Sequence, residues 1–242
     1  MKRTVVCCLC ALILGCVWAL TGLGDVSAVT GSVQLVRADR SPRTNSNAGV
    51  VVWLTPFLKQ PDATGRAATR PRIVQREKRF EPRLLVVEVG TTVDFPNNDP
   101  FFHNVFSLFD GKRFDLGLYE AGATKNVKFT RTGVCYIFCN IHSQMSAVVV
   151  VVDTPYYVRL NNPGDFRIPE LPLGRYQLNV WAERSSPETL KAASRQVNVA
   201  AVPLNVGTIV LQESKDVIPA HTNKYGKDYD TPVFSSPIYT QP

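Results

Sequence analysis

Histidine and methionine are scarce in this chain, which has three His and two Met in 242 residues. No His-rich or Met-rich tract is present, so the sequence lacks the usual signature of a metal-capturing segment. Three imidazoles are also too few for a multinuclear cluster that depends on histidine ligands. Most multicopper enzymes are therefore excluded, and any metal site must be small.

Helical periodicity is almost absent as well. Only the stretch that follows Ser186, with Pro187 at the first helical position, has the capping pattern of a short helix of about two turns. Elsewhere, short runs of β-branched and aromatic residues alternate with Gly, Pro and Asn. This pattern predicts an all-β protein.

Cysteine is concentrated at the N-terminus, where four of the six cysteines fall within the first 28 residues. Those residues have a basic start at Lys2-Arg3, an apolar stretch over 4–20 and a small-residue pattern that ends at Ala28. This arrangement predicts a Sec signal peptide over 1–28, cleavage after Ala28, and a periplasmic or otherwise exported protein. The mature chain would then have no disulfide framework.

Two alternatives to a cleaved leader remain. Residues 13–16 approximate a lipobox with Cys16 as the lipidated residue, although the apolar stretch continues beyond it. An uncleaved anchor is the other, but a stretch of about 17 residues is at the short limit for crossing a bilayer. After removal of the leader we expect no stable membrane span.

The most informative segment is 139–145, which contains Cys139, His142 and Met145 at three-residue spacings, with His103 36 residues before the cysteine. A thiolate, two imidazoles and a thioether are the donors of a mononuclear blue-copper site. The flanking runs 134–138 and 147–152 are rich in strand-forming residues. The three ligands would therefore lie on one tight loop between two strands, with His103, Cys139, His142 and Met145 as the copper ligands.

The surroundings of these residues resemble the cupredoxins of the plastocyanin and amicyanin type. The stretch Phe95-Pro96-Asn97-Asn98, followed after four residues by His103-Asn104-Val105, matches theirs, and Gly133 lies six residues before Cys139 as expected. The resemblance covers about residues 72–153. It implies a Greek-key β-sandwich with one type 1 copper, and a hydrogen bond from Asn104 to the cysteine loop. It also implies an exposed edge of His142 as the electron port, ringed by apolar residues such as Phe101 and Phe102.

Two other kinds of metal site are alternatives to this interpretation. Zinc would use the Cys and two His but would gain little from a thioether. The spacing Cys135-x-x-x-Cys139 is similar to that of a binuclear CuA centre, but that centre needs three residues between the second Cys and the His, and this chain has two. Cys135 also falls inside an expected strand, too far along an extended chain from Cys139 for a disulfide, and is interpreted as a small buried thiol.

A second resemblance covers the stretch 164–181, which is similar to carboxypeptidase regulatory-like, transthyretin-like β-sandwiches. Period-two alternation at Tyr176, Leu178 and Val180 predicts a strand with one buried face. The segments 31–36 and 49–54 resemble the first hairpin of such a sandwich. We therefore expect the cupredoxin domain to be inserted into the second sandwich, a simple tandem being the alternative. The expected divisions are the leader 1–28, first hairpin 29–58, basic linker 59–71, cupredoxin domain 72–153, remainder of the sandwich 154–213 and polar tail 214–242.

These features predict an exported electron carrier and not an enzyme. A second catalytic copper of the nitrite-reductase type needs three more imidazoles, and only His221 is spare. The net charge is +7, or +6 once the leader with Lys2, Arg3 and Asp25 is removed. A basic surface favours an acidic redox partner, such as a c-type cytochrome, and no nucleic-acid-binding module is recognisable. The alternatives are a copper-delivery protein and an envelope-associated binding protein whose copper module is structural.

Overall fold

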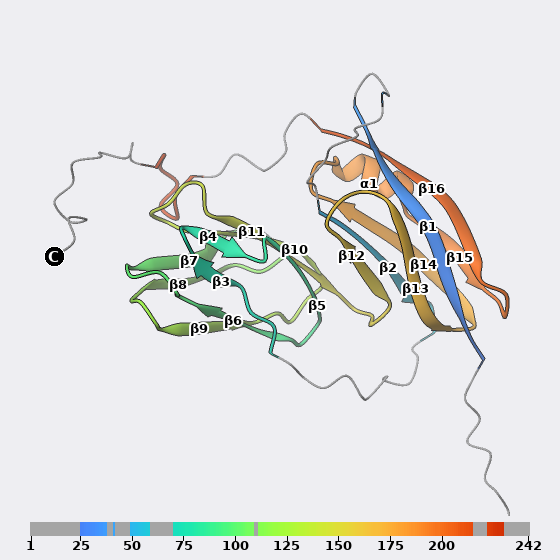
Figure 1. The fold of residues 1–242 in the computed structure, drawn as a ribbon, viewed down its shortest axis with the longest axis horizontal. Coiled ribbons are helices and arrows are strands. Elements are labelled where there is room, and N and C mark those ends of the chain that lie inside the picture. Colours follow the sequence, from blue (N-terminus) through green and yellow to red (C-terminus); the bar gives the residue numbers. More distant parts are fainter. Residues whose placement is uncertain are drawn as a thin grey trace, which may run out of the picture.

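The computed structural model describes residues 25–37, 41, 49–58, 70–108, 111–214 and 222–229. Across this part of the chain the regular secondary structure is all strand apart from one short helix, α1. The all-β prediction is confirmed. The described strands form two groups, and each group pairs only within itself (Figure 1). We call them the outer group and the inner group, because the inner group lies between the two halves of the outer group in the sequence.

The outer group contains two sheets, with strand orders β13-β1-β16 and β12-β2-β14-β15. In the first sheet, β1 runs antiparallel to β13 and parallel to β16. The elements of the outer group are β1 (Val26–Val36), β2 (Val50–Pro56), β12 (Tyr157–Leu160), β13 (Asp165–Pro172), β14 (Gly174–Ala182), α1 (Pro187–Ala193), β15 (Arg195–Val199) and β16 (Leu204–Gln212).

The inner group is built on the five-stranded sheet β5-β11-β10-β7-β8, with two-stranded sheets β6-β9 and β3-β4 beside it. Its strands are β3 (Val74–Arg76), β4 (Arg79–Glu81), β5 (Leu84–Glu88), β6 (Thr92–Pro96), β7 (His103–Ser107), β8 (Phe114–Tyr119), β9 (Thr124–Lys128), β10 (Gly133–Phe138) and β11 (Ser146–Val152). Within the inner group, the longest ladder joins β10 to β11 in antiparallel register.

Several local predictions are confirmed. In β14, Tyr176, Leu178 and Val180 are buried in the core of the outer group, as their alternation predicts. The helix begins after Ser186, whose side chain accepts a hydrogen bond from the backbone N–H of Thr189 at 3.3 Å, and Pro187 occupies its first position.

One local expectation is wrong. β1 and β2 lie in different sheets of the outer group and do not pair with each other, so they are not the hairpin expected over 29–58. Both strands nevertheless bury side chains in the same core, Val33 and Leu35 from β1 and Val52 and Leu54 from β2. A buried, alternating pattern specifies which face is covered but not which strand is the neighbour.

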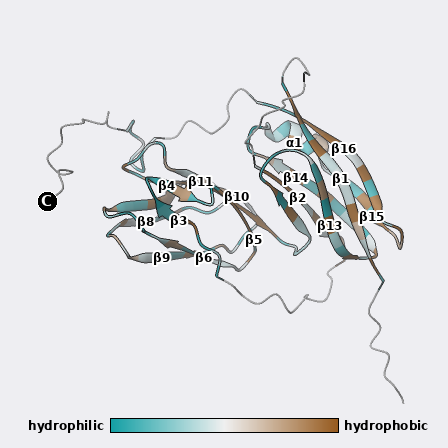
Figure 2. Ribbon diagram, viewed as in Figure 1, coloured by the Kyte–Doolittle hydropathy of each residue, from teal (hydrophilic) through white to brown (hydrophobic). Residues whose placement is uncertain are grey.

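A third hydrophobic cluster joins the two groups. Val51 and Trp181 of the outer group pack with Val86, Val148 and Val150 of the inner group, and all are buried. Figure 2 shows the hydrophobic stretches of β5 and β10 between the groups. Because burying a valine side chain contributes about 1.5 kcal/mol or more, this contact holds the two groups together.

Polar contacts surround this cluster. Arg83 Nη1 donates to Glu183 Oε2 at 2.5 Å, and Thr154 Oγ1 donates to the carbonyl oxygen of Leu54 at 2.9 Å. Thr55 Oγ1 donates to Asp153 Oδ1 at 2.9 Å. These contacts place the start of β12 beside the end of β2, where the chain enters and leaves the inner group.

Parts of the predicted organisation lie outside the described residues. They are the leader up to residue 24, positions 38–40 and 42–48 of the expected hairpin, positions 59–69 of the basic linker, positions 109–110 of the expected cupredoxin domain, and positions 215–221 and 230–242 of the tail. The predicted cleavage point after Ala28 falls within β1, which begins at Val26.

Candidate metal centre

Cys139, His142 and Met145 lie on the loop that joins β10 to β11. Phe138 and Ser146 are directly paired across the two strands, so the loop closes immediately beyond the ladder. Two backbone hydrogen bonds tighten it, from Met145 N to the His142 carbonyl at 3.0 Å and from Cys139 N to the Met145 carbonyl at 3.3 Å. The sequence therefore produces a compact loop anchored on rigid strands.

His103 reaches the same place from the neighbouring strand. It is the first residue of β7, which pairs with β10 through Phe106 and Phe138. Its side chain is fully buried. Ligand atoms of His103, Cys139 and His142 all lie within 4.8 Å of one another, so three of the four predicted ligand side chains converge.

The distances between these three side chains fit a metal ion that all three would hold. Cys139 Sγ lies 3.8 Å from His103 Nδ1 and 3.7 Å from His142 Nδ1. Metal–nitrogen bonds of about 2.0 Å and a metal–sulfur bond of about 2.3 Å, typical of zinc, would place nitrogen and sulfur about 3.7 Å apart at an angle of 120°. A tetrahedral angle would bring them to about 3.5 Å. The observed separations fit a single metal ion shared by the three side chains.

The electrostatic surroundings favour neutral imidazoles. Burial lowers the pKa of His142 to about 4, helped by the neighbouring His103. Burial also lowers the pKa of His103, an effect that Asp99 opposes. Neutral imidazole is the form that binds metals. Burial raises the pKa of the Cys139 thiol, although backbone N–H groups directed at its sulfur partly offset this; binding of a metal would release that proton.

Met145 is fully buried in the same hydrophobic core as Cys139. The loop hydrogen bonds fix its backbone against Cys139 and His142. Its place as the axial ligand stays a prediction.

Asp99 is a partner of the site that the sequence alone did not reveal. Its Oδ2 lies 2.7 Å from His103 Nε2, on the side of the imidazole opposite Cys139. One sequence feature could have pointed to Asp99. It is the only acidic residue in a stretch of Asn, Pro and Phe, and it lies four positions before the candidate ligand His103.

Asn104 differs in part from its expected role. Its side-chain Nδ2 donates to Asp115 Oδ1 at 2.7 Å and not to the cysteine loop. Its backbone N–H is instead directed at the Cys139 thiol, where it lowers the pKa. Asp115 can take the side-chain bond because β8 pairs with β7 beside Asn104.

The segment 222–229 of the predicted tail contacts the ligand loop. The Lys224 backbone N–H donates to Asn140 Oδ1 at 2.9 Å, and Tyr229 Oη donates to the Cys139 carbonyl at 3.0 Å. Lys224 Nζ also lies 2.8 Å from Asp115 Oδ2. Composition indicates only that this stretch is polar, and no motif in it predicts these contacts.

The remaining candidates do not join the site. Cys135 is a buried free thiol that donates to Ser107 Oγ at 3.2 Å and to the Lys112 carbonyl at 3.3 Å. Among the described residues it is not part of the convergent group, as a CuA centre would require. His221 lies outside the described residues.

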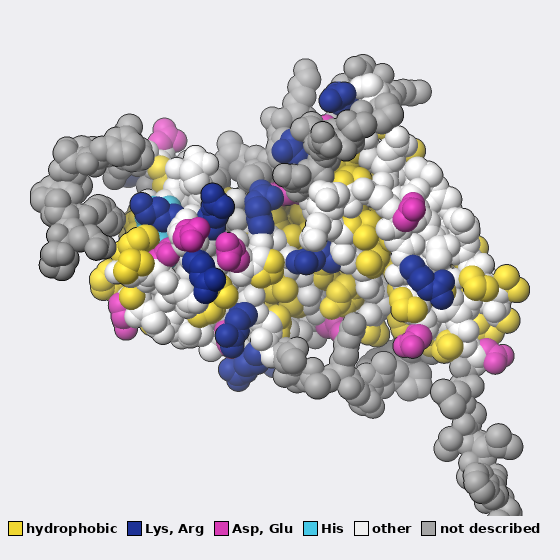
Figure 3. Space-filling view, in the orientation of Figure 1, with side chains coloured by type: hydrophobic (Ala, Val, Ile, Leu, Met, Phe, Trp, Pro, Cys, Tyr) yellow, Lys and Arg dark blue, Asp and Glu magenta, His cyan; other side chains and the backbone are white. Residues whose placement is uncertain are grey.

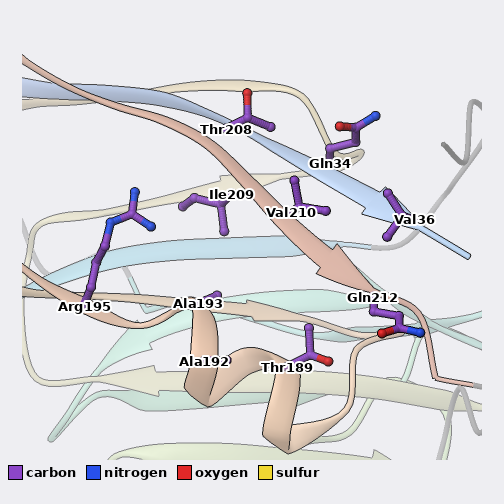
Figure 4. A pocket seen from close by; sticks show the side chains of 10 residues that line it. All are labelled: Gln34, Val36, Thr189, Ala192, Ala193, Arg195, Thr208, Ile209, Val210 and Gln212. Carbon is purple, nitrogen blue, oxygen red and sulfur yellow. The ribbon is translucent and has the colours of Figure 1, made fainter. Parts of the chain in front are cut away.

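A separate hollow of about 760 Å³ lies in the outer group, between α1, β1 and β16. Figure 4 shows Gln34, Thr189, Arg195 and Gln212 around it. It shares no lining residue with the metal centre.

No protein-family profile matches this sequence, and no curated protein matches it. Several solved structures are similar to part of the chain. A purple cupredoxin from Nitrosopumilus maritimus is 26% identical over 34% of this chain and 99% of its own, with a TM-score of 0.32. A copper-containing nitrite reductase from Thermus scotoductus is 26% identical over 39% of this chain but only 26% of its own, with a TM-score of 0.34.

A reduced amicyanin variant is 20% identical over 41% of this chain and 91% of its own, with a TM-score of 0.33. All three TM-scores are below 0.5, so these similarities carry no argument about what the site binds. What the site can bind follows from its own side chains. Separately, within the described residues no helix is long and apolar enough to cross a membrane.

Proposed function

We propose that this chain is an exported type 1 copper protein that binds one copper ion and carries single electrons between redox partners. The ligands would be His103, Cys139, His142 and Met145. The observation that carries the proposal is the convergence of the Cys139 sulfur with one imidazole nitrogen of His142 on the same loop, at 3.7 Å, and one of His103 on β7, at 3.8 Å. A thioether is a poor donor for zinc, whereas a set of one thiolate, two imidazoles and a thioether is characteristic of blue copper.

The protein would contribute rigidity and a path for the electron. When bound, copper would supply a one-electron Cu(I)/Cu(II) couple. Cys139 would provide the covalent electronic path, and Met145 would tune the reduction potential from the axial side. Because the loop is closed by backbone hydrogen bonds and flanked by paired strands, the ligands would move little when the charge changes.

We place the electron port at His142, which is only half-buried. Its ring lies 5.9 Å from the ring of Phe101, and the neighbouring side chains Ile141 and Phe102 are exposed. An apolar rim of this kind suits the small, short-lived contacts of electron-transfer complexes.

The expected partner is an exported redox protein with an acidic surface, such as a c-type cytochrome. Figure 3 shows Lys and Arg side chains along the inner group, with acidic side chains between them. Such a mixed surface would steer a partner mainly at low ionic strength. We do not expect catalysis by the chain itself.

We further propose that the inner group is a domain inserted into the outer one, a transthyretin-like sandwich. The pairing of β2 with both β12 and β14, on the far side of the inner group in the sequence, supports this. Export is proposed from the leader alone. N-terminal sequencing of the mature protein tests it, and would also show whether cleavage spares the residues of β1 before Val29.

Optical and EPR spectra of the copper-loaded protein test the function. We expect intense blue or violet absorbance in the oxidised form, a mononuclear Cu(II) signal, and a reversible one-electron wave in voltammetry. A colourless oxidised protein would overturn the proposal. Blue absorbance with rapid loss of copper to a chelator and no redox wave would indicate a delivery protein instead.

A further inference from the structure

His103 has a carboxylate on the side of its ring that faces away from the cysteine. Asp99 Oδ2 lies 2.7 Å from His103 Nε2, and Asp99 is 5% exposed while His103 is fully buried. A carboxylate can only accept hydrogen bonds, so Nε2 must carry the proton. The lone pair of the imidazole is then on Nδ1, which points at Cys139 Sγ.

A neighbouring turn holds the carboxylate in place. Asp99 Oδ1 accepts from the backbone N–H of Glu77 at 2.6 Å, and Oδ2 accepts from that of Lys78 at 2.9 Å. Glu77 and Lys78 form the turn between β3 and β4, with φ values of 51° and 55°. Non-glycine residues rarely adopt this left-handed conformation, so the turn accepts backbone strain while presenting both N–H groups to one side chain.

The loop that contains Asp99 is fixed from the other side by a buried asparagine. Asn97 Oδ1 accepts from the Asp99 backbone N–H at 3.1 Å, and Asn97 Nδ2 donates to the carbonyls of Phe101 and Tyr119 at 2.8 and 3.2 Å. The carboxylate is therefore positioned by the inner group and does not depend on a metal to hold it.

Both oxygens of the Asp99 carboxylate face N–H donors, Oδ1 that of Glu77 and Oδ2 those of Lys78 and His103. An ionised carboxylate, which only accepts hydrogen bonds, matches this set of donors. An ionised acceptor makes a stronger hydrogen bond than a neutral carbonyl does and increases the basicity of the imidazole.

We propose that Asp99 is a positioning residue that fixes the tautomer of His103 and lowers the reduction potential of the bound copper. This rests on the proposed function. A buried negative charge behind a ligand favours the higher charge of Cu(II) over Cu(I), because like and unlike charges interact strongly away from water. The thiolate of Cys139 and the carboxylate of Asp99 would act in the same direction from opposite sides of the imidazole.

Asp99→Asn tests the proposal, because it removes the charge while keeping the size and one acceptor oxygen for His103. We expect the ratio of Cu(I) to Cu(II) affinity to rise at least tenfold, which corresponds to a potential about 59 mV more positive for a one-electron couple. The matched control is Asp94→Asn on β6, which removes the same charge from a side chain 3.8 Å from Arg70. The control should change the ratio less than twofold.

An unchanged potential in Asp99→Asn, or an equal shift in both variants, would overturn the proposal while leaving the blue-copper function intact. A wild-type protein that is colourless when oxidised would instead remove the function. Because the variant can fail to fold, nitrogen-15 NMR of the metal-free wild type provides an independent measurement. We expect a protected, downfield Nε2–H signal from His103; a proton on Nδ1 would contradict the assignment of the tautomer.

Discussion

The phenol of Tyr229 donates a hydrogen bond of 3.0 Å to the backbone carbonyl of Cys139, which lies 90 residues earlier in the chain. Burial, with the Cys139 thiol nearby, raises the pKa of Tyr229 to about 12, so the phenol stays protonated and able to donate. Together with the bond from Lys224 to Asn140, this contact ties the segment 222–229 to the ligand loop. A stretch far from the ligands in sequence therefore stabilises the loop that carries them.

Tyr229→Phe should loosen this attachment. The variant keeps the ring but leaves the Cys139 carbonyl without its phenolic donor, so we expect the free energy of unfolding to fall by about 0.5–1.5 kcal/mol. The segment 222–229 should also be cleaved faster in limited proteolysis. Tyr225→Phe is the control, because Tyr225 is 70% exposed on the same segment. Equal proteolysis of both variants would show that the Tyr229 hydroxyl does not hold the segment.

The residues of the site that could be predicted are those that a short stretch of sequence specifies. His103, Cys139 and His142 were identified from donor chemistry and spacing, and the structure brings these three together because adjacent strands of one sheet carry them. Asp99 and Tyr229 were missed because each acts through one hydrogen bond across a turn or a long loop. A single acidic or aromatic residue in a polar stretch has no spacing that specifies such a contact.

The ion pair between Arg83 and Glu183 provides a test of the contact between the two strand groups. Glu183 is 8% exposed, and the pair joins the start of β5 to the end of β14. Since Arg83 is half-exposed and its charge is screened, we expect Glu183→Gln to lower the free energy of unfolding by only about 1–2 kcal/mol. Glu120→Gln, on an exposed side chain of the inner group, should change it by less than about 0.5 kcal/mol. Calorimetry can check both, and no difference between them would mean that the pair contributes nothing to the contact.

In the fold, too, the features that could be predicted are those that neighbouring residues determine. The alternation of Tyr176, Leu178 and Val180 specified a buried face, and the capping pattern at Ser186 specified the start of α1; both depend on neighbouring residues only. The partner of β1 was predicted wrongly, because β13 and β16 lie more than a hundred residues further along the chain. Pairing at that separation depends on how the whole core packs.

Cys135 should behave as an inert thiol. Burial raises its pKa to about 11, so thiolate at pH 8 is about a hundredfold rarer than in a thiol with the ordinary value of 9.0. Peptide-resolved alkylation at pH 8 should label Cys135 at least a hundredfold more slowly in the folded protein than in urea.

The sign of the pH dependence follows from the same shift. Between pH 9 and pH 11 the folded state keeps a proton on Cys135 that the unfolded state has lost, so stability is present below pH 9 and is lost as the pH rises through 11. Cys135→Ala should remove that part of the alkaline loss. Fast labelling of the native protein, or an unchanged alkaline slope in the variant, would contradict the assignment.

The roles of the two sulfur ligands can be separated by their effects on the spectrum and the potential. Cys139→Ser replaces a soft thiolate by a hydroxyl, so the intense blue absorbance of the copper-loaded protein should disappear. Met145→Leu nearly conserves volume at a fully buried position and should cost less than about 1.5 kcal/mol of stability. It replaces a weak axial donor by a purely hydrocarbon side chain, and a less coordinated, less polar site disfavours the higher charge of Cu(II), so the protein should retain copper and colour while its potential becomes more positive. Cys135→Ser is the control, because its thiol bonds to Ser107 and Lys112 outside the convergent group, and its blue band should be unchanged. Loss of colour in Cys135→Ser with retention in Cys139→Ser would reverse the assignment of the thiolate, and an unchanged potential in Met145→Leu would remove Met145 from the ligand set.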